Sequence, residues 1–114
     1  MATIYAAIAI LGMTAILGMY LLSLILRTKS TPKGITIVHG LLAATALVLL
    51  IVYCVGHKPG PWISLIVFIV AASGGFILNY RDITGKSVPK WLGIVHGLIA
   101  IVGFALLLCF AFWK

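Results

Sequence analysis

The chain is almost without acidic residues, because Asp82 is the single carboxylate side chain among 114 residues and charged residues make up 8% of the total. Hydrophobic residues, in contrast, make up 64%. A soluble domain is usually about 45–50% apolar and about 25% charged, and so short a chain cannot bury this much apolar surface in one core. The composition therefore excludes an ordinary soluble domain and indicates a protein whose solvent is lipid.

Charges are also absent from the interiors of four long apolar stretches, which cover residues 3–26, 35–55, 62–80 and 91–113. A helix needs about 20 mainly apolar residues to span a bilayer, so each stretch is long enough. None shows the polar–apolar alternation of a membrane β-barrel strand. We therefore expect an all-α fold: an integral membrane four-helix up-down bundle that forms a single transmembrane domain over residues 1–114.

Basic residues gather in two of the three connections between these stretches. Six of the eight Lys and Arg residues fall within residues 27–33 and 81–90, and the net charge is +7. Short basic loops stay on the cytoplasmic side of a membrane, so we expect both termini on the periplasmic side of a bacterial inner membrane. No basic residue precedes the first stretch, as a cleavable signal requires, so we expect that helix to be retained. The small basic clusters favour contact with lipid headgroups over nucleic-acid binding.

An internal repeat is visible where the second and fourth stretches begin. Residues 32–41 read PKGITIVHGL, and residues 89–98 read PKWLGIVHGL. The shared segment predicts two tandem helical hairpins, residues 1–57 and 58–114, which cross the membrane in the same direction and are related by an axis along its normal. Arg27 and Arg81 are expected to end the first helix of each hairpin, with the second loop three residues longer.

Each copy of the repeat carries one histidine inside a helix, His39 and His96. In an up-down bundle the second and fourth helices stand on a diagonal, so these side chains should face each other at one depth. Each lies seven residues after the proline at its helix start, which puts the imidazole about 10 Å below the helix ends. Ionisable side chains inside a membrane are costly and mark functional sites.

Small residues surround both histidines on their own helix faces. Three residues before and one, four and seven residues after each histidine stand Thr36, Gly40, Ala43 and Ala46 in the second stretch and Gly93, Gly97, Ala100 and Gly103 in the fourth. Ser73-Gly74-Gly75 adds small residues in the third stretch. A flat macrocycle needs such clearance, and haem iron accepts axial histidine nitrogens. The pattern therefore predicts one haem b, with His39 and His96 as the metal ligands.

The haem propionates would need cationic partners, because they are carboxylates. Arg27, Arg81, Lys33 and Lys90 are expected at the nearest membrane surface. Charge-assisted hydrogen bonds from such side chains suit carboxylates well. These four residues are therefore the predicted propionate partners.

A buried histidine on a Gly/Ala-rich helix face, with basic loops at the membrane surface, resembles the small four-helix b-type membrane cytochromes of the cytochrome b561 group. The resemblance covers the four-helix core and rests on His39, His96 and their small neighbours. It implies electron transfer, as an electron carrier or a membrane oxidoreductase. Because the haem would lie toward the cytoplasmic side of a core about 30 Å thick, we expect exchange with a lipid quinone or a redox partner protein near that side. Members of that group commonly carry four helix-borne ligands and two haems, whereas two histidines here supply one bis-histidine haem.

The residues alone leave alternatives open. Small residues also line ordinary transmembrane helix contacts, so the histidines could be packed side chains in a haem-free subunit of a larger complex. A transport module is another alternative, although the first helix lacks the glutamate of the small multidrug resistance transporters. Haem could also lie between the chains of a homodimer. A weaker metal-site candidate combines Cys54, His57 and Cys109, and no Cys-x-x-Cys-His motif indicates covalent haem attachment.

Overall fold

The computed structural model describes residues 1–113, which form four helices: α1 (Ala2–Leu26), α2 (Lys33–Gly56), α3 (Trp62–Ile83) and α4 (Lys90–Phe112). The shortest of them has 22 residues, so at about 1.5 Å per residue each can cross a hydrocarbon core of about 30 Å. Large apolar side chains cover the outside of the bundle; Phe76 is 73% exposed and Ile63 is 71% exposed. With four helices long and apolar enough to cross a membrane, the chain is an integral membrane protein.

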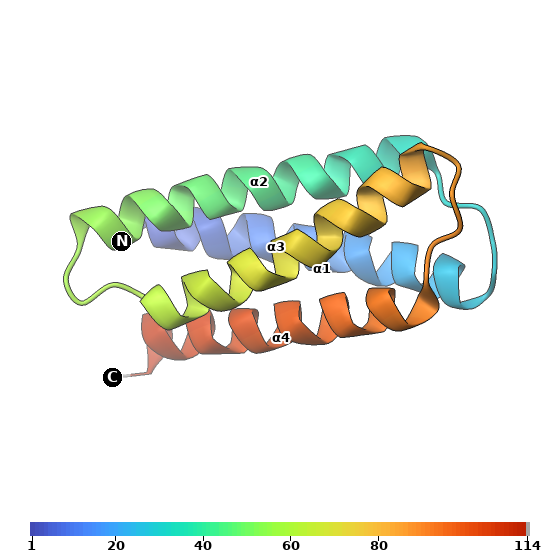
Figure 1. Cartoon of the computed structure of the whole chain (residues 1–114). Helices are drawn as coiled ribbons and strands as arrows, with labels where there is room; N and C mark the ends of the chain where they lie inside the picture. The colour runs from blue at the N-terminus through green and yellow to red at the C-terminus, as the bar shows by residue number, and fades with distance from the viewer. Residues whose placement is uncertain (114) are drawn as a thin grey trace.

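The helices form an up-down bundle in which α1 packs against α2, α2 against α3 and α3 against α4, and α1 closes the ring on α4. Over residues 1–113, the backbones of the diagonal pairs, α1 with α3 and α2 with α4, do not pack against each other, and only side chains such as those of Tyr53 and Phe110 meet across the bundle. Figure 1 shows the connections after α1 and α3 at one end of the bundle, and the start of α1 with the α2–α3 connection at the other end. The predicted all-α four-helix membrane bundle is confirmed. We call the end that holds residues 27–32 and 84–89 the basic end.

The two hairpins match at a constant offset of 57 positions. Both α1 and α3 end in a Schellman motif, with Thr28 (φ 55°) and Gly85 (φ 76°) in the left-handed conformation at equivalent places. The residue that caps the C-terminal end of α1 is Arg27, and the equivalent residue after α3 is Thr84. The expectation of a longer second loop was therefore wrong, because Arg81 lies inside the last turn of α3 rather than at its end.

Packing differs between the two halves of the bundle. At the end opposite the basic end, Ile4, Leu50 and Leu107 are completely buried and belong to one core cluster. In the same half, the Ser64 hydroxyl donates a hydrogen bond of 2.8 Å to the Gly103 carbonyl and so joins α3 to α4. The close-packed half holds the helices together, and the half nearer the basic end contains a cavity.

Candidate cofactor site

A cavity of about 340 Å³ lies between the four helices and is lined by both repeat histidines. Ligand pockets in proteins typically measure about 300–1,000 Å³, so this volume is at the lower end of that range. Most of the lining side chains are glycine, alanine and aliphatic residues contributed by all four helices. The site is therefore an apolar chamber with two imidazoles inside it.

Each imidazole is held by the backbone of the preceding helix in its own hairpin. Nδ1 of His39 lies 2.9 Å from the Thr14 carbonyl oxygen of α1, and Nδ1 of His96 lies 2.7 Å from the Ala71 carbonyl oxygen of α3. A carbonyl can only accept a hydrogen bond, so Nδ1 carries the proton and donates in both rings. Each Nε2 is consequently left with its lone pair, which is the form in which histidine binds a metal.

A glycine one turn beyond each carbonyl makes room for the ring. A Cβ atom at Gly18 would lie 2.9 Å from Cε1 of His39, and one at Gly75 would lie 2.8 Å from Cε1 of His96. Carbon atoms in contact are normally about 3.5–4.0 Å apart, so any side chain here would push the imidazole away. Each hairpin thus contains the same unit of carbonyl, glycine and histidine.

The two units bring the imidazoles together across the bundle. The ring centroids of His39 and His96 are 6.3 Å apart, and their planes make an angle of 83°. Within the described part of the chain, no hydrogen bond engages Nε2 of either ring. The diagonal placement expected from the repeat is therefore the one that the fold produces.

The small residues proposed to surround a macrocycle divide into two groups. Ala43, Gly93, Gly97 and Ala100 line the cavity. Gly40 instead faces Asn79, because a Cβ atom at Gly40 would lie 2.6 Å from the Asn79 amide nitrogen.

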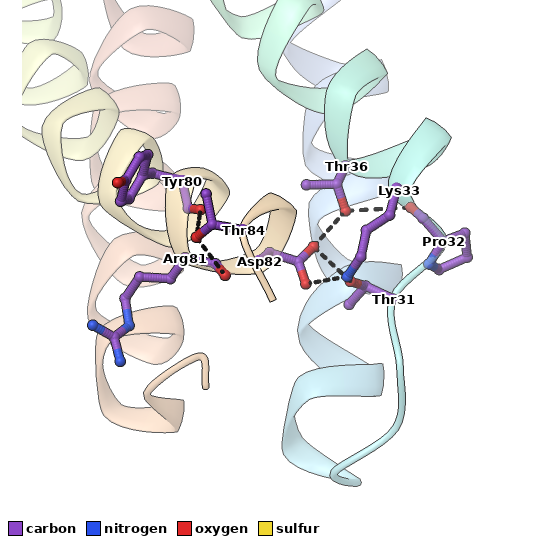
Figure 2. A network of polar contacts seen from close by, with 8 residues as sticks. All are labelled: Thr31, Pro32, Lys33, Thr36, Tyr80, Arg81, Asp82 and Thr84. Atoms are coloured by element: carbon purple, nitrogen blue, oxygen red, sulfur yellow. Dashed lines mark hydrogen bonds and ion pairs between the residues drawn. The ribbon is translucent and has the colours of Figure 1, made fainter. Parts of the chain in front are cut away.

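The basic residues proposed as propionate partners do not line the cavity. Lys33 forms an ion pair of 2.7 Å with Asp82, as Figure 2 shows. Arg27 donates to the Ser23 carbonyl of its own helix, and Lys90 is an exposed residue at the start of α4.

Arg81 lies on the other side of the same helix turn. Its guanidinium points away from Asp82 in Figure 2 and donates to the carbonyl of Ser87, in the loop before α4. Arg27, Lys33 and Arg81 thus make other contacts in this structure, and their assignment to haem propionates stays a prediction.

The weaker metal-site candidate is not assembled. Among residues 1–113, no three His, Cys, Asp or Glu side chains lie close enough to hold a metal ion together. Cys54 is buried and Cys109 is exposed. The His57 ring stacks on Tyr53 at a centroid distance of 4.1 Å, so it is already engaged by its own helix.

The residues that hold the imidazoles were not singled out by the IVHGL motif, because they lie on the other helix of each hairpin. The offset of 57 positions would have found the glycines. Apart from Gly40 and Gly97, the one pair of glycines at this spacing is Gly18 and Gly75. The carbonyls of Thr14 and Ala71 have no sequence signal, because any residue supplies a carbonyl group.

Comparison of the chain with models of protein families, with curated proteins and with solved structures gave no significant match.

Proposed function

We propose that the chain is a b-type membrane cytochrome, with the architecture of the small b561-like cytochromes, that holds one haem through His39 and His96. The observation that carries the proposal is the spacing of these rings. A metal–nitrogen bond of about 2.0–2.1 Å, with a ring nitrogen about 1.1 Å from its centroid, puts two coaxial imidazoles on one metal about 6.2–6.4 Å apart. The centroids of His39 and His96 are 6.3 Å apart, which is the spacing expected of two imidazoles on one metal.

The hydrogen bonds of the two rings support the same assignment. Histidines that bind metals usually donate their second ring nitrogen to a carbonyl or carboxylate, which fixes the tautomer and the ring orientation. His39 and His96 do so through backbone carbonyls of α1 and α3. These anchors belong to the rigid helices, so the rings are oriented before any ligand binds.

When bound, haem supplies one-electron exchange at its iron. The protein contributes two neutral imidazole ligands and a chamber of mainly aliphatic and small residues that keeps bulk water away. Both rings come from one chain, so we assign one haem to each chain rather than to a dimer interface. Packing of the histidines without a ligand is the competing reading, because edge-to-face aromatic pairs also have centroids 4.5–7 Å apart.

The orientation and the partners are part of the proposal. The excess of Lys and Arg at the basic end favours the cytoplasmic face of a bacterial inner membrane for that end. The imidazoles lie in the half of the bundle nearer this end. Exchange of electrons with a lipid quinone or with a cytoplasmic redox protein is then shorter than transfer to the opposite face.

A visible absorption spectrum of the purified protein tests the proposal. Protein from haem-replete cells should show the spectrum of a six-coordinate low-spin haem at one haem per chain. His39→Ala and His96→Ala should each abolish that spectrum, because each removes an axial ligand. His57→Ala is the matched control and should leave it unchanged.

Two results would contradict the proposal. The first is a colourless preparation that also fails to take up added haem, which would favour a haem-free subunit or a transport module. The second is a six-coordinate spectrum that persists in both His39→Ala and His96→Ala, which would place the ligands elsewhere.

A further inference from the structure

The two copies of the repeat differ in the polarity of the residues with which they line the cavity. Four polar residues line the wall formed by α2, α3 and the loop before α2: Thr31, Thr36, Asn79 and Asp82. At the offset of 57 positions, the opposite wall of α1, α4 and the loop before α4 has apolar residues in the same places: Val88, Gly93, Leu22 and Ile25. We call these the polar wall and the apolar wall. A duplicated hairpin would begin with identical walls, so the difference is a feature of this cavity.

Most of the polar wall satisfies its own hydrogen bonds. The Asp82 carboxylate accepts hydrogen bonds from the hydroxyls of Thr31 and Thr36 and from the Lys33 ammonium group, as drawn in Figure 2. The Thr36 hydroxyl lies 2.9 Å from that carboxylate. This cluster ties the start of α2 to the end of α3 and has no free donor directed at the cavity.

Asn79 is the exception on this wall. Its side-chain oxygen Oδ1 is buried and has no hydrogen-bond partner within residues 1–113. Buried polar atoms in folded proteins are nearly always paired, with protein groups, with water or with a ligand. An amide in an apolar chamber can both accept and donate, so the unpaired oxygen points to a missing partner with a hydrogen-bond donor.

The space around this amide is shaped by Gly40. A Cβ atom there would come within 2.6 Å of the Asn79 amide nitrogen, whereas at Gly97, the equivalent position, the nearest atom would be Cδ2 of Leu22 at 3.9 Å. The glycine of the first IVHGL segment therefore leaves the room that the Asn79 amide occupies. On the apolar wall, a side chain at Gly97 would meet no such close neighbour.

The Asn79 amide also lies apart from the histidine ligands. Gly75, which contacts the His96 ring, precedes Asn79 by four residues, or about 6 Å along a helix. The amide is therefore displaced toward the basic end from the level at which an iron would bind. A group held by Asn79 leaves both imidazoles free, but it lies in the same cavity as the proposed macrocycle, so it binds the chain in its haem-free form.

We infer that the cavity binds a lipophilic alcohol, aromatic or aliphatic, whose hydroxyl pairs with the Asn79 amide while its hydrocarbon lies against the apolar wall. A hydroxyl can donate to Oδ1 and accept from the amide nitrogen, and the cavity of about 340 Å³ is large enough for one such molecule. This site goes beyond the proposed function, because binding requires no iron.

The test measures the binding of 4-decylphenol to the purified, haem-free full-length chain in phosphatidylcholine nanodiscs, corrected for partition into empty nanodiscs. Its methyl ether, 4-decylanisole, lacks the donor and should bind about tenfold more weakly, which corresponds to the loss of one hydrogen bond. Asn79→Leu installs the residue that α1 carries at the equivalent place. It should weaken binding of the phenol by about tenfold or more and binding of the ether by less, because the ether has no donor for Oδ1.

A second pair of variants tests the same contact in case Asn79→Leu does not fold. Gly40→Ala leaves Asn79 in the chain but displaces its amide, and should weaken phenol binding, whereas Gly34→Ala, which adds a methyl group in open space on the same helix, should not. Decan-1-ol identifies the class of alcohol: Asn79-dependent binding of decanol equal to that of the phenol indicates an aliphatic alcohol, and preference for the phenol indicates an aromatic one. Absence of binding of both alcohols, or equal binding of phenol and ether, would overturn the inference. Equal phenol binding by the wild-type chain and Asn79→Leu would also overturn it.

Discussion

Replacing Gly75 with alanine should misplace the His96 ligand, and the distances give the size of the effect. The added Cβ would lie 2.8 Å from Cε1 of the ring. Since carbon atoms in contact are about 3.5 Å apart at the closest, the ring must move by about 0.7 Å. Its hydrogen bond to the Ala71 carbonyl, now 2.7 Å long, would then stretch toward about 3.4 Å, beyond the usual limit of about 3.2 Å.

The expected change in stability is small. Overpacking of a well-packed site destabilises a protein by about 1–3 kcal/mol, and replacing a helical glycine with alanine recovers up to about 1 kcal/mol. A net loss of about 0–2 kcal/mol should leave the bundle folded. Gly75→Ala should therefore insert and purify normally but lose the low-spin bis-histidine spectrum proposed for the wild-type chain.

Gly74→Ala is the matched control, because it adds the same methyl group to the same helix. Its Cβ would lie 3.8 Å from the nearest atom, Cβ of His96, which is an ordinary contact. Absorption spectra during haem titration, together with size-exclusion profiles of both variants, provide the measurement. If Gly75→Ala formed the same six-coordinate haem as Gly74→Ala, the argument that this glycine positions the imidazole would fail.

Two further predictions concern polar contacts between helices and can be read from thermal unfolding in detergent. Asp82→Ala should destabilise the chain by about 1–3 kcal/mol, because the hydroxyls of Thr31 and Thr36 lose the carboxylate that accepts from both. Lys33→Ala should cost less than about 1 kcal/mol, since this side chain is 49% exposed, and equal losses in the two variants would contradict this ranking. Ser64→Ala should cost about 0.6–1.5 kcal/mol by removing the buried bond to Gly103. Ser73→Ala should change little, because this exposed hydroxyl bonds to its own helix, and a larger effect for Ser73→Ala would refute the assignment.

The fold was predictable because every signal for it is local. Continuous apolar runs define the four helices, and Pro32 and Pro89 lie immediately before the first residues of α2 and α4. The boundaries were less accurate at the far end of α3, which continues through Arg81 to Ile83. A polar last turn can extend beyond the hydrocarbon, so loss of hydrophobicity marks the edge of the membrane and not the end of the helix.

The histidine pair was predictable because the repeat puts both residues at one depth, and the up-down order puts their helices on one diagonal of the bundle. The groups that accept hydrogen bonds from the two rings were not predictable. Thr14 and Ala71 act through backbone carbonyls, which every residue possesses. The roles expected for Arg27 and Arg81 depended on the direction of long flexible side chains. That direction follows from nearby carbonyls, of Ser23 in α1 and of Ser87 in a loop, which the sequence does not place.

The sequence by itself determined that this is an integral membrane protein, that four helices cross the membrane, and that one hairpin with a histidine is repeated. Tertiary structure decided which faces of those helices meet. The helices are apolar on nearly all sides, so no amphipathic stripe indicates the face that turns inward. Only the packing of all four helices brings the rings of His39 and His96 to 6.3 Å. The same packing places Asn79 and Leu22 on opposite walls of one cavity.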